Sequence, residues 1–147
     1  MHDIGKIAID QSILEKPEPL TEAEKLEVQR HVETGYRILS SVSGFANIAE
    51  HVLAHHEIWD GQGYPKGLKG EEIPLEARII AIAEAYDAMT AEMPFRRALS
   101  KKEAVREIRQ NAGTQFDPEV ARVFITKVLE VENGATDPTP SEPGFAY

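Results

Sequence analysis

The chain has 147 residues, 41% of them hydrophobic, and carries 25 acidic against 16 basic residues for a formal net charge of −9. This size suits one globular domain with a substantial core, and the acidic balance argues against a broad interface with DNA or RNA. The lack of cysteine excludes disulfides and thiolate metal sites, and neither a signal segment nor a membrane-length apolar run is found. We therefore expect a cytoplasmic protein that binds neither DNA nor membranes.

Apolar residues recur at a spacing of three and four along most of the chain, which predicts an all-α fold of about five helices. A capping box at Thr21–Glu24 begins a helical run that ends before Gly44. A second helix is expected over roughly residues 46–59. The stretch "DGQGYPKGLKGEEIP" that follows, with four glycines and two prolines, is typical of a loop between helices.

Three more helices are expected in the second half of the chain. The longest covers roughly residues 74–92. Another begins at a second capping box, Ser100–Glu103, and a third begins at Asp117, a cap residue placed directly before a proline. From residue 134 onward, three prolines and no periodicity predict a flexible tail, so the domain is expected to comprise residues 1–133 and the tail residues 134–147.

The histidines give the first indication of chemistry. The "HD" pair places an imidazole beside a carboxylate, and "HHE" puts two imidazoles about 100° apart on one helix, where both border a cavity if the helix edges it. Imidazole and carboxylate ligands together suit divalent iron, manganese or zinc. His51 and His55 lack the intervening glutamate of a zinc-protease motif, and we expect His51 on the surface or behind the ligands. The five histidines are His2, His31, His51, His55 and His56.

The long helix adds two carboxylates in "EAYD", Glu84 and Asp87, which are three residues apart and face roughly the same way. Glu84 borders the predicted apolar stripe of that helix. That position supports two roles for Glu84 equally: a metal ligand that faces inward, or a solvated carboxylate at the edge of the stripe. The stripe consists of Ile79, Ile82, Ala83, Tyr86 and Met89.

Several motifs follow the pattern of one known family. Residues 2–6 read "HDIGK", residues 55–68 read "HHEIWDGQGYPKGL", and "IPLEARIIAIAEAYDAMT" and "GTQFDPEV" stand further along. In these stretches the sequence resembles the HD-GYP family, a bacterial branch of the HD phosphohydrolases that hydrolyses cyclic di-GMP. The resemblance runs from residue 2 to about residue 125 and implies an HD-type helical bundle.

The resemblance implies roles for particular residues. Lys6 is implied to contact a substrate phosphate or to assist the attack on phosphorus. Asp3 is implied to be a carboxylate that bridges two metal ions. The turn Gly63-Tyr64-Pro65 is implied to shape the site and to contact the nucleotide or partner domains. For Arg96, contact with substrate phosphates and solvation of a helix end are equally supported. The implied metal ligands are His2, Asp3, His31, His55, His56 and Glu84.

The function implied is that of a metal-dependent phosphodiesterase that opens cyclic di-GMP to the linear dinucleotide, to GMP, or to both. Two ions, iron or manganese, would form a nucleophile near neutral pH and neutralise the phosphodiester. One alternative is a degenerate regulatory module with weak or no catalysis, which docks a diguanylate cyclase domain through the Gly-Tyr-Pro surface. Another is a nucleotide phosphohydrolase of the wider HD superfamily, which the Gly-Tyr-Pro loop disfavours.

The sequence departs from the family pattern in three places. Helices that normally precede the "HD" pair and carry a further ligand are absent, so we expect the chain to begin inside a domain. Either a longer protein carries sensory or receiver modules upstream, or the chain is a fragment, and uncovered apolar surface would favour a homodimer. Glu84 replaces an aspartate. Met93 replaces an arginine that contacts the dinucleotide, for which Arg96 compensates in part.

Overall fold

The computed structural model describes residues 1–93 and 96–129, which form helices and no β-strand, so the predicted all-α class is confirmed. Among these residues, none of the helices combines the length and the apolar character needed to cross a lipid bilayer. The predicted tail lies outside the described residues. The elements are η1 (Ile4–Ala8), α1 (Gln11–Leu14), α2 (Glu22–Gln29), α3 (His31–Ser40), α4 (Ala46–Ala54), η2 (Gly70–Glu72), α5 (Leu75–Thr90), α6 (Lys101–Gln110), α7 (Pro118–Val123) and η3 (Phe124–Val128).

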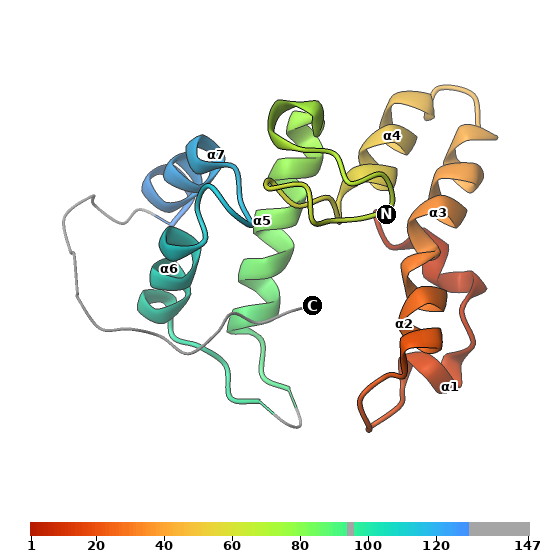
Figure 1. Ribbon diagram of the computed structural model, residues 1–147, viewed down its shortest axis with the longest axis horizontal. Coiled ribbons are helices and arrows are strands. Elements are labelled where there is room, and N and C mark those ends of the chain that lie inside the picture. The colour runs from red at the N-terminus through yellow and green to blue at the C-terminus, as the bar shows by residue number, and fades with distance from the viewer. Residues whose placement is uncertain (94–95, 130–147) are drawn as a thin grey trace.

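The long helix α5 stands between two groups of helices (Figure 1). We call η1 and α1–α4 the N-terminal group, and α6, α7 and η3 the C-terminal group. One core cluster joins α5 to the C-terminal group, and a smaller one joins α3 to α4. The first includes Ile82, Met89, Ile108, Phe116 and Ile125, and the second consists of Leu39, Ala49 and Val52.

Local sequence sets the start of three helices. Both predicted capping boxes are present, because Thr21 with Glu24, and Ser100 with Glu103, exchange hydrogen bonds between side chain and backbone. Asp117 accepts hydrogen bonds from two amides in the first turn of α7. These three helices therefore begin where their cap residues predict.

The helical run expected between residues 21 and 43 is two helices, α2 and α3, which meet at Arg30. The amide of Arg30 bonds back to the carbonyl oxygen of Glu27, as in a 3₁₀ turn. Directly after the break, the Nδ1 atom of the His31 ring lies 2.7 Å from the carbonyl oxygen of Val28. The break thus lets an imidazole bond to the last turn of the preceding helix.

The buried face of α5 agrees with the predicted apolar stripe only in part. Ile82 and Met89 are buried as expected, but Ile79 is 46% exposed and Ala83 is also exposed. Ala77 and Ala85 are buried instead. Helices pack on both sides of α5, and small side chains permit close approach there, so a stripe of mostly large apolar residues predicts only part of the buried surface of this helix.

The first residues are held against α3 by close contact between two backbones. Gly5 is buried, and a Cβ atom at this position would overlap the carbonyl group of His31 and crowd the amide nitrogen of Gly35. Only glycine permits this approach. As a result η1 fixes the preceding residues, His2 and Asp3, beside the start of α3.

Candidate metal centre

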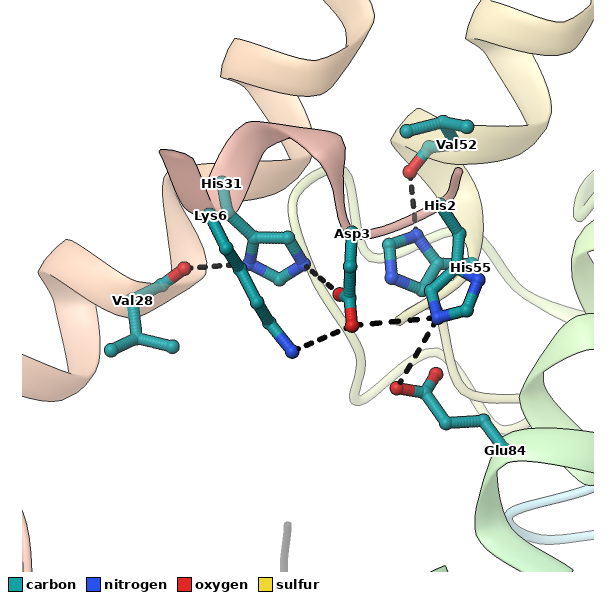
Figure 2. A network of polar contacts seen from close by, with 8 residues as sticks. All are labelled: His2, Asp3, Lys6, Val28, His31, Val52, His55 and Glu84. Carbon is teal, nitrogen blue, oxygen red and sulfur yellow. Dashed lines mark hydrogen bonds and ion pairs between the residues drawn. The ribbon is translucent and has the colours of Figure 1, made fainter. Parts of the chain in front are cut away.

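Six side chains from four parts of the chain converge between the N-terminal group and α5, and Figure 2 shows five of them. Neighbouring imidazole rings lie between 4.1 and 5.5 Å apart, measured between centroids. All six are the residues for which the family resemblance implies a ligand role. They are His2 and Asp3 before η1, His31 at the start of α3, His55 and His56 at the end of α4, and Glu84 in α5.

The six residues form two ligand groups. We call His31, His55 and His56 the imidazole group, and His2, Asp3 and Glu84 the carboxylate group. Within each group, one ligand atom of every residue lies within 4.8 Å of the others. The rings of His31 and His55 are each 1% exposed, whereas the members of the carboxylate group are only half-buried. Each group has enough suitable atoms for a divalent cation.

Hydrogen bonds orient two rings of the imidazole group. The Nδ1 atoms of His31 and His55 lie 2.7 and 2.6 Å from the carbonyl oxygens of Val28 and Val52 (Figure 2). A carbonyl oxygen only accepts, so each Nδ1 carries the hydrogen and each Nε2 keeps a lone pair in the neutral ring. Both Nε2 atoms are buried and have no hydrogen-bond partner. Such orphaned acceptors fit a cation, because a buried polar atom without a partner is otherwise costly.

The carboxylate of Asp3 faces both groups. Its Oδ1 atom lies 3.6 Å from Nε2 of His31, and its Oδ2 atom lies 3.5 Å from Nε2 of His2 (Figure 2). The same Oδ2 accepts a hydrogen bond of 2.8 Å from Nζ of Lys6. Burial opposes ionisation of Asp3, but the hydrogen bond and charge of Lys6, with the two imidazoles, hold its pKa below the ordinary value. Asp3 is therefore an anion placed to contact cations in either group.

Burial changes the protonation of other members of the centre. It lowers the pKa of His55 to about 4 and that of His56 to about 3, and the neighbouring rings add to the shift. Both rings are therefore neutral at pH 7 and remain so as the pH falls toward 5, and a histidine must be neutral to bind a metal ion. Burial also raises the pKa of Glu84, and the negative charge of Asp3 adds to this shift although His2 opposes it.

Chelator-treated protein should become less stable as the pH falls from 7 to 5. In this range the unfolded chain, with histidine pKa values near 6.5, binds protons that the folded rings of His55 and His56 refuse. The expected loss in the free energy of unfolding is about 2 kcal/mol for each ring. Urea unfolding at both pH values measures it. The variant His56→Gln should lose less than the wild type, whereas His51→Gln should lose as much, and equal losses in all three proteins would contradict the prediction.

The predicted Gly63-Tyr64-Pro65 turn reaches the centre through Tyr64. The tyrosine ring stacks on the ring of His56, with centroids 5.0 Å apart and an interplanar angle of 22°. A Cβ atom at Gly63 would overlap the backbone amide nitrogen of Ile58 and the backbone of the two residues before it, so this glycine lets the loop fold back on the end of α4. Pro65 is exposed. Burial, with the charges of Glu84 and Asp3, raises the pKa of the Tyr64 hydroxyl, which stays protonated.

Glu57 has a structural role that sequence reasoning missed. Its side chain is 4% exposed, and its two carboxylate oxygens accept hydrogen bonds from the backbone amides of Lys66 at 2.7 Å and Leu68 at 2.9 Å. The carboxylate therefore ties the middle of the Gly/Pro-rich loop to the end of α4, one residue after His56. The available signal was an acidic residue set directly after two histidines, at the point where a helix gives way to a loop.

Replacing Glu57 with glutamine should loosen the Gly/Pro-rich loop. An amide keeps only one acceptor oxygen, so one buried amide loses its partner, at a cost of about 1–3 kcal/mol. Urea unfolding should show the loss, and hydrogen exchange should speed up at the amides of Lys66 and Leu68. The exposed glutamate of α4 provides the matched control Glu50→Gln, which should change neither quantity. Unchanged exchange in the Glu57 variant would contradict the role given to this carboxylate.

Arg96 and His51 lie outside both ligand groups. The guanidinium of Arg96 donates to the carbonyl oxygen of Ala88 in α5 and lies 3.9 Å from the sulfur of Met93. These contacts favour a role at the helix end over contact with phosphate. His51 pairs with Glu76 across α4 and α5 at 3.3 Å. It is not a member of the centre.

Comparison with known proteins bears on this geometry. A model of the HD domain family matches residues 1–120. The chain is 44% identical over 139 residues to a cyclic di-GMP phosphodiesterase of Thermotoga maritima, covering 93% of this chain and 37% of that protein. It is 44% identical over 119 residues to 3'3'-cGAMP-specific phosphodiesterase 3 of Vibrio cholerae, covering 81% of this chain and 26% of that protein. The chain thus spans well under half the length of these relatives.

A solved structure supports the fold. The crystal structure of a cyclic GMP-AMP-specific phosphodiesterase of Vibrio cholerae aligns with a TM-score of 0.59 at 24% identity, over 86% of this chain and 33% of that one. The helical architecture and the clustered imidazoles and carboxylates are those of an α-helical protein able to hold divalent cations. The chain belongs to the HD domain family, and its identity to curated cyclic di-GMP phosphodiesterases confirms the predicted HD-GYP relationship.

Proposed function

We propose that this chain is the catalytic domain of a metal-dependent phosphodiesterase that hydrolyses cyclic di-GMP to the linear dinucleotide, GMP, or both. The observation that carries the proposal is the pair of buried Nε2 atoms, on His31 and His55, that have no hydrogen-bond partner, together with the equally orphaned Oδ1 of Asp3, which faces Nε2 of His31 at 3.6 Å. A docking surface would not need these atoms together and unpaired. The names of the relatives support the choice of a cyclic dinucleotide as substrate.

The proposed centre is binuclear. The imidazole group with Oδ1 of Asp3 would hold one ion, and the carboxylate group would hold the other. Mixed nitrogen and oxygen ligands suit iron or manganese. When bound, such ions supply Lewis acidity, which activates water near neutral pH and offsets the charge of a phosphodiester. An acidic chain can then accept an anionic substrate.

Residues around the centre would bind and orient the dinucleotide. The ammonium of Lys6, now 2.8 Å from Asp3, can turn to a non-bridging phosphate oxygen and stabilise negative charge as it develops. The protonated hydroxyl of Tyr64 can donate a hydrogen bond to the phosphate or to a base, while its ring keeps His56 in place. The carboxylate of Glu57 holds the loop that carries Tyr64.

Turnover assays test this proposal directly. The chain, freed of metal and then loaded with Mn²⁺ or, without oxygen, with Fe²⁺, is incubated with cyclic di-GMP and separately with 3'3'-cGAMP, and products are separated by chromatography. We expect linear dinucleotide or GMP from cyclic di-GMP, and none after chelation. Preferred cleavage of 3'3'-cGAMP would overturn the substrate assignment. Tight binding of cyclic di-GMP to metal-loaded protein without cleavage would overturn the enzymatic role in favour of a regulatory module.

A further inference from the structure

The two oxygens of Asp3 have different surroundings. Oδ1 is buried, has no hydrogen-bond partner and faces Nε2 of His31 at 3.6 Å. Oδ2 lies 2.8 Å from the ammonium of Lys6 and 3.5 Å from Nε2 of His2. One oxygen is therefore available to a cation without any rearrangement, whereas the other already contacts a positive charge.

The two ligand groups also differ in burial and in the charged side chains that contact them. The imidazole group is largely buried, and its rings have no charged partner other than Asp3 among the described ion pairs. The side chains of the carboxylate group, His2, Asp3 and Glu84, are 36%, 38% and 32% exposed. In a half-exposed site, an ammonium on one of the ligand oxygens competes directly with a divalent ion.

Resting on the proposed binuclear function, we infer that Lys6 is a built-in competitor for the second cation, so that the imidazole group fills first and the carboxylate group fills second and more weakly. The ammonium neutralises Oδ2 of Asp3 while the carboxylate group holds no ion. A second ion binds only after Lys6 has turned away from this oxygen. The side chain implied to contact phosphate thus also sets the metal content of the centre.

Removing the positive charge of Lys6 should strengthen binding of the second ion more than binding of the first. Mn²⁺ is titrated by calorimetry into chelator-treated chain, and free Mn²⁺ is followed in parallel by electron paramagnetic resonance. For the wild type we expect two steps of unequal affinity. In Lys6→Met the second dissociation constant should fall by about tenfold, because a repulsive unit charge has left its ligand oxygen, while the first, whose ligand oxygen Lys6 does not contact, changes much less. Lys6→Gln serves as a second variant should the methionine variant not fold.

A matched control is available in α2. Lys25 contacts Glu22 at 2.8 Å with the same spacing of three residues, away from both ligand groups. Lys25→Met should leave both steps as in the wild type. A second step that is unchanged or weaker in the folded Lys6 variants would overturn the inference, and so would two equal steps in the wild type.

The titration is independent of turnover. A strengthened second step without cleavage of cyclic dinucleotides would sustain the competition and overturn the proposed function. Cleavage with an unchanged second step would sustain the function and overturn the competition. Folded chain that binds no Mn²⁺ would overturn both.

Discussion

The variant Asp3→Asn should turn over cyclic di-GMP at a rate reduced by a factor of about 10³ or more. The reason is that several kcal/mol of charge stabilisation in the transition state depend on this one carboxylate. Asp3 is the residue of the centre that faces both ligand groups, through Oδ1 and Oδ2. Asparagine keeps the shape but has no negative charge and only one acceptor oxygen. Steady-state kinetics and the metal content after loading measure the effect, and both should fall together.

Asp87 provides the matched control for this substitution. It is an exposed carboxylate of α5, three residues after Glu84, and belongs to neither ligand group. Asp87→Asn should keep wild-type turnover and metal content. If Asp3→Asn also kept both, within a factor of about three, the assignment of Asp3 as a shared ligand would be wrong.

Replacing Gly5 with alanine should destabilise the fold by about 3 kcal/mol and displace the start of the chain. The added methyl group would overlap the carbonyl group of His31, and the obstacle is backbone rather than a side chain that can rotate away. Because η1 carries His2 and Asp3, its displacement should also weaken metal binding. Urea unfolding and Mn²⁺ titration measure the two effects.

Gly44→Ala separates steric overlap from the general cost of replacing glycine. Gly44 has a φ of 90°, and a Cβ atom there would meet nothing within 4 Å. Its replacement should cost only the strain of that conformation, about 1–2 kcal/mol, and should leave metal binding unchanged. Equal stability and equal metal affinity of the two variants would argue against close backbone contact at Gly5.

Local rules predicted the parts of the fold that depend on neighbouring residues. The capping boxes at Thr21 and Ser100 and the cap at Asp117 each involve residues within one turn of the helix, and all three are present. The break at Arg30 was not predicted: it accompanies a contact of the His31 ring with the preceding helix, and apolar periodicity does not report a polar contact of this kind. Pattern alone thus predicts helix starts better than helix continuity.

The candidate centre, too, was predicted from the sequence only in part. Motif resemblance implied the six residues that the structure brings together, but it implied nothing about which oxygen of Asp3 meets Lys6. The role of Glu57 was also missed, because its partners are backbone amides nine and eleven residues away across a loop. Contacts made by the backbone carry no residue signature, so only coordinates reveal them. The ligand roles themselves stay predictions until metal is measured.

The position of α5 between the two helix groups has a consequence for local unfolding. Glu84 lies between Ile82 and Ala85, whose side chains belong to the core shared with the C-terminal group, whereas the other five residues of the centre come from the N-terminal group. The centre therefore straddles two regions that can open as separate cooperative units. Transient opening of α5 together with the C-terminal group would withdraw a single carboxylate, that of Glu84, and leave the four imidazoles assembled, so amide exchange in α6 and metal exchange at the carboxylate group should share one opening rate.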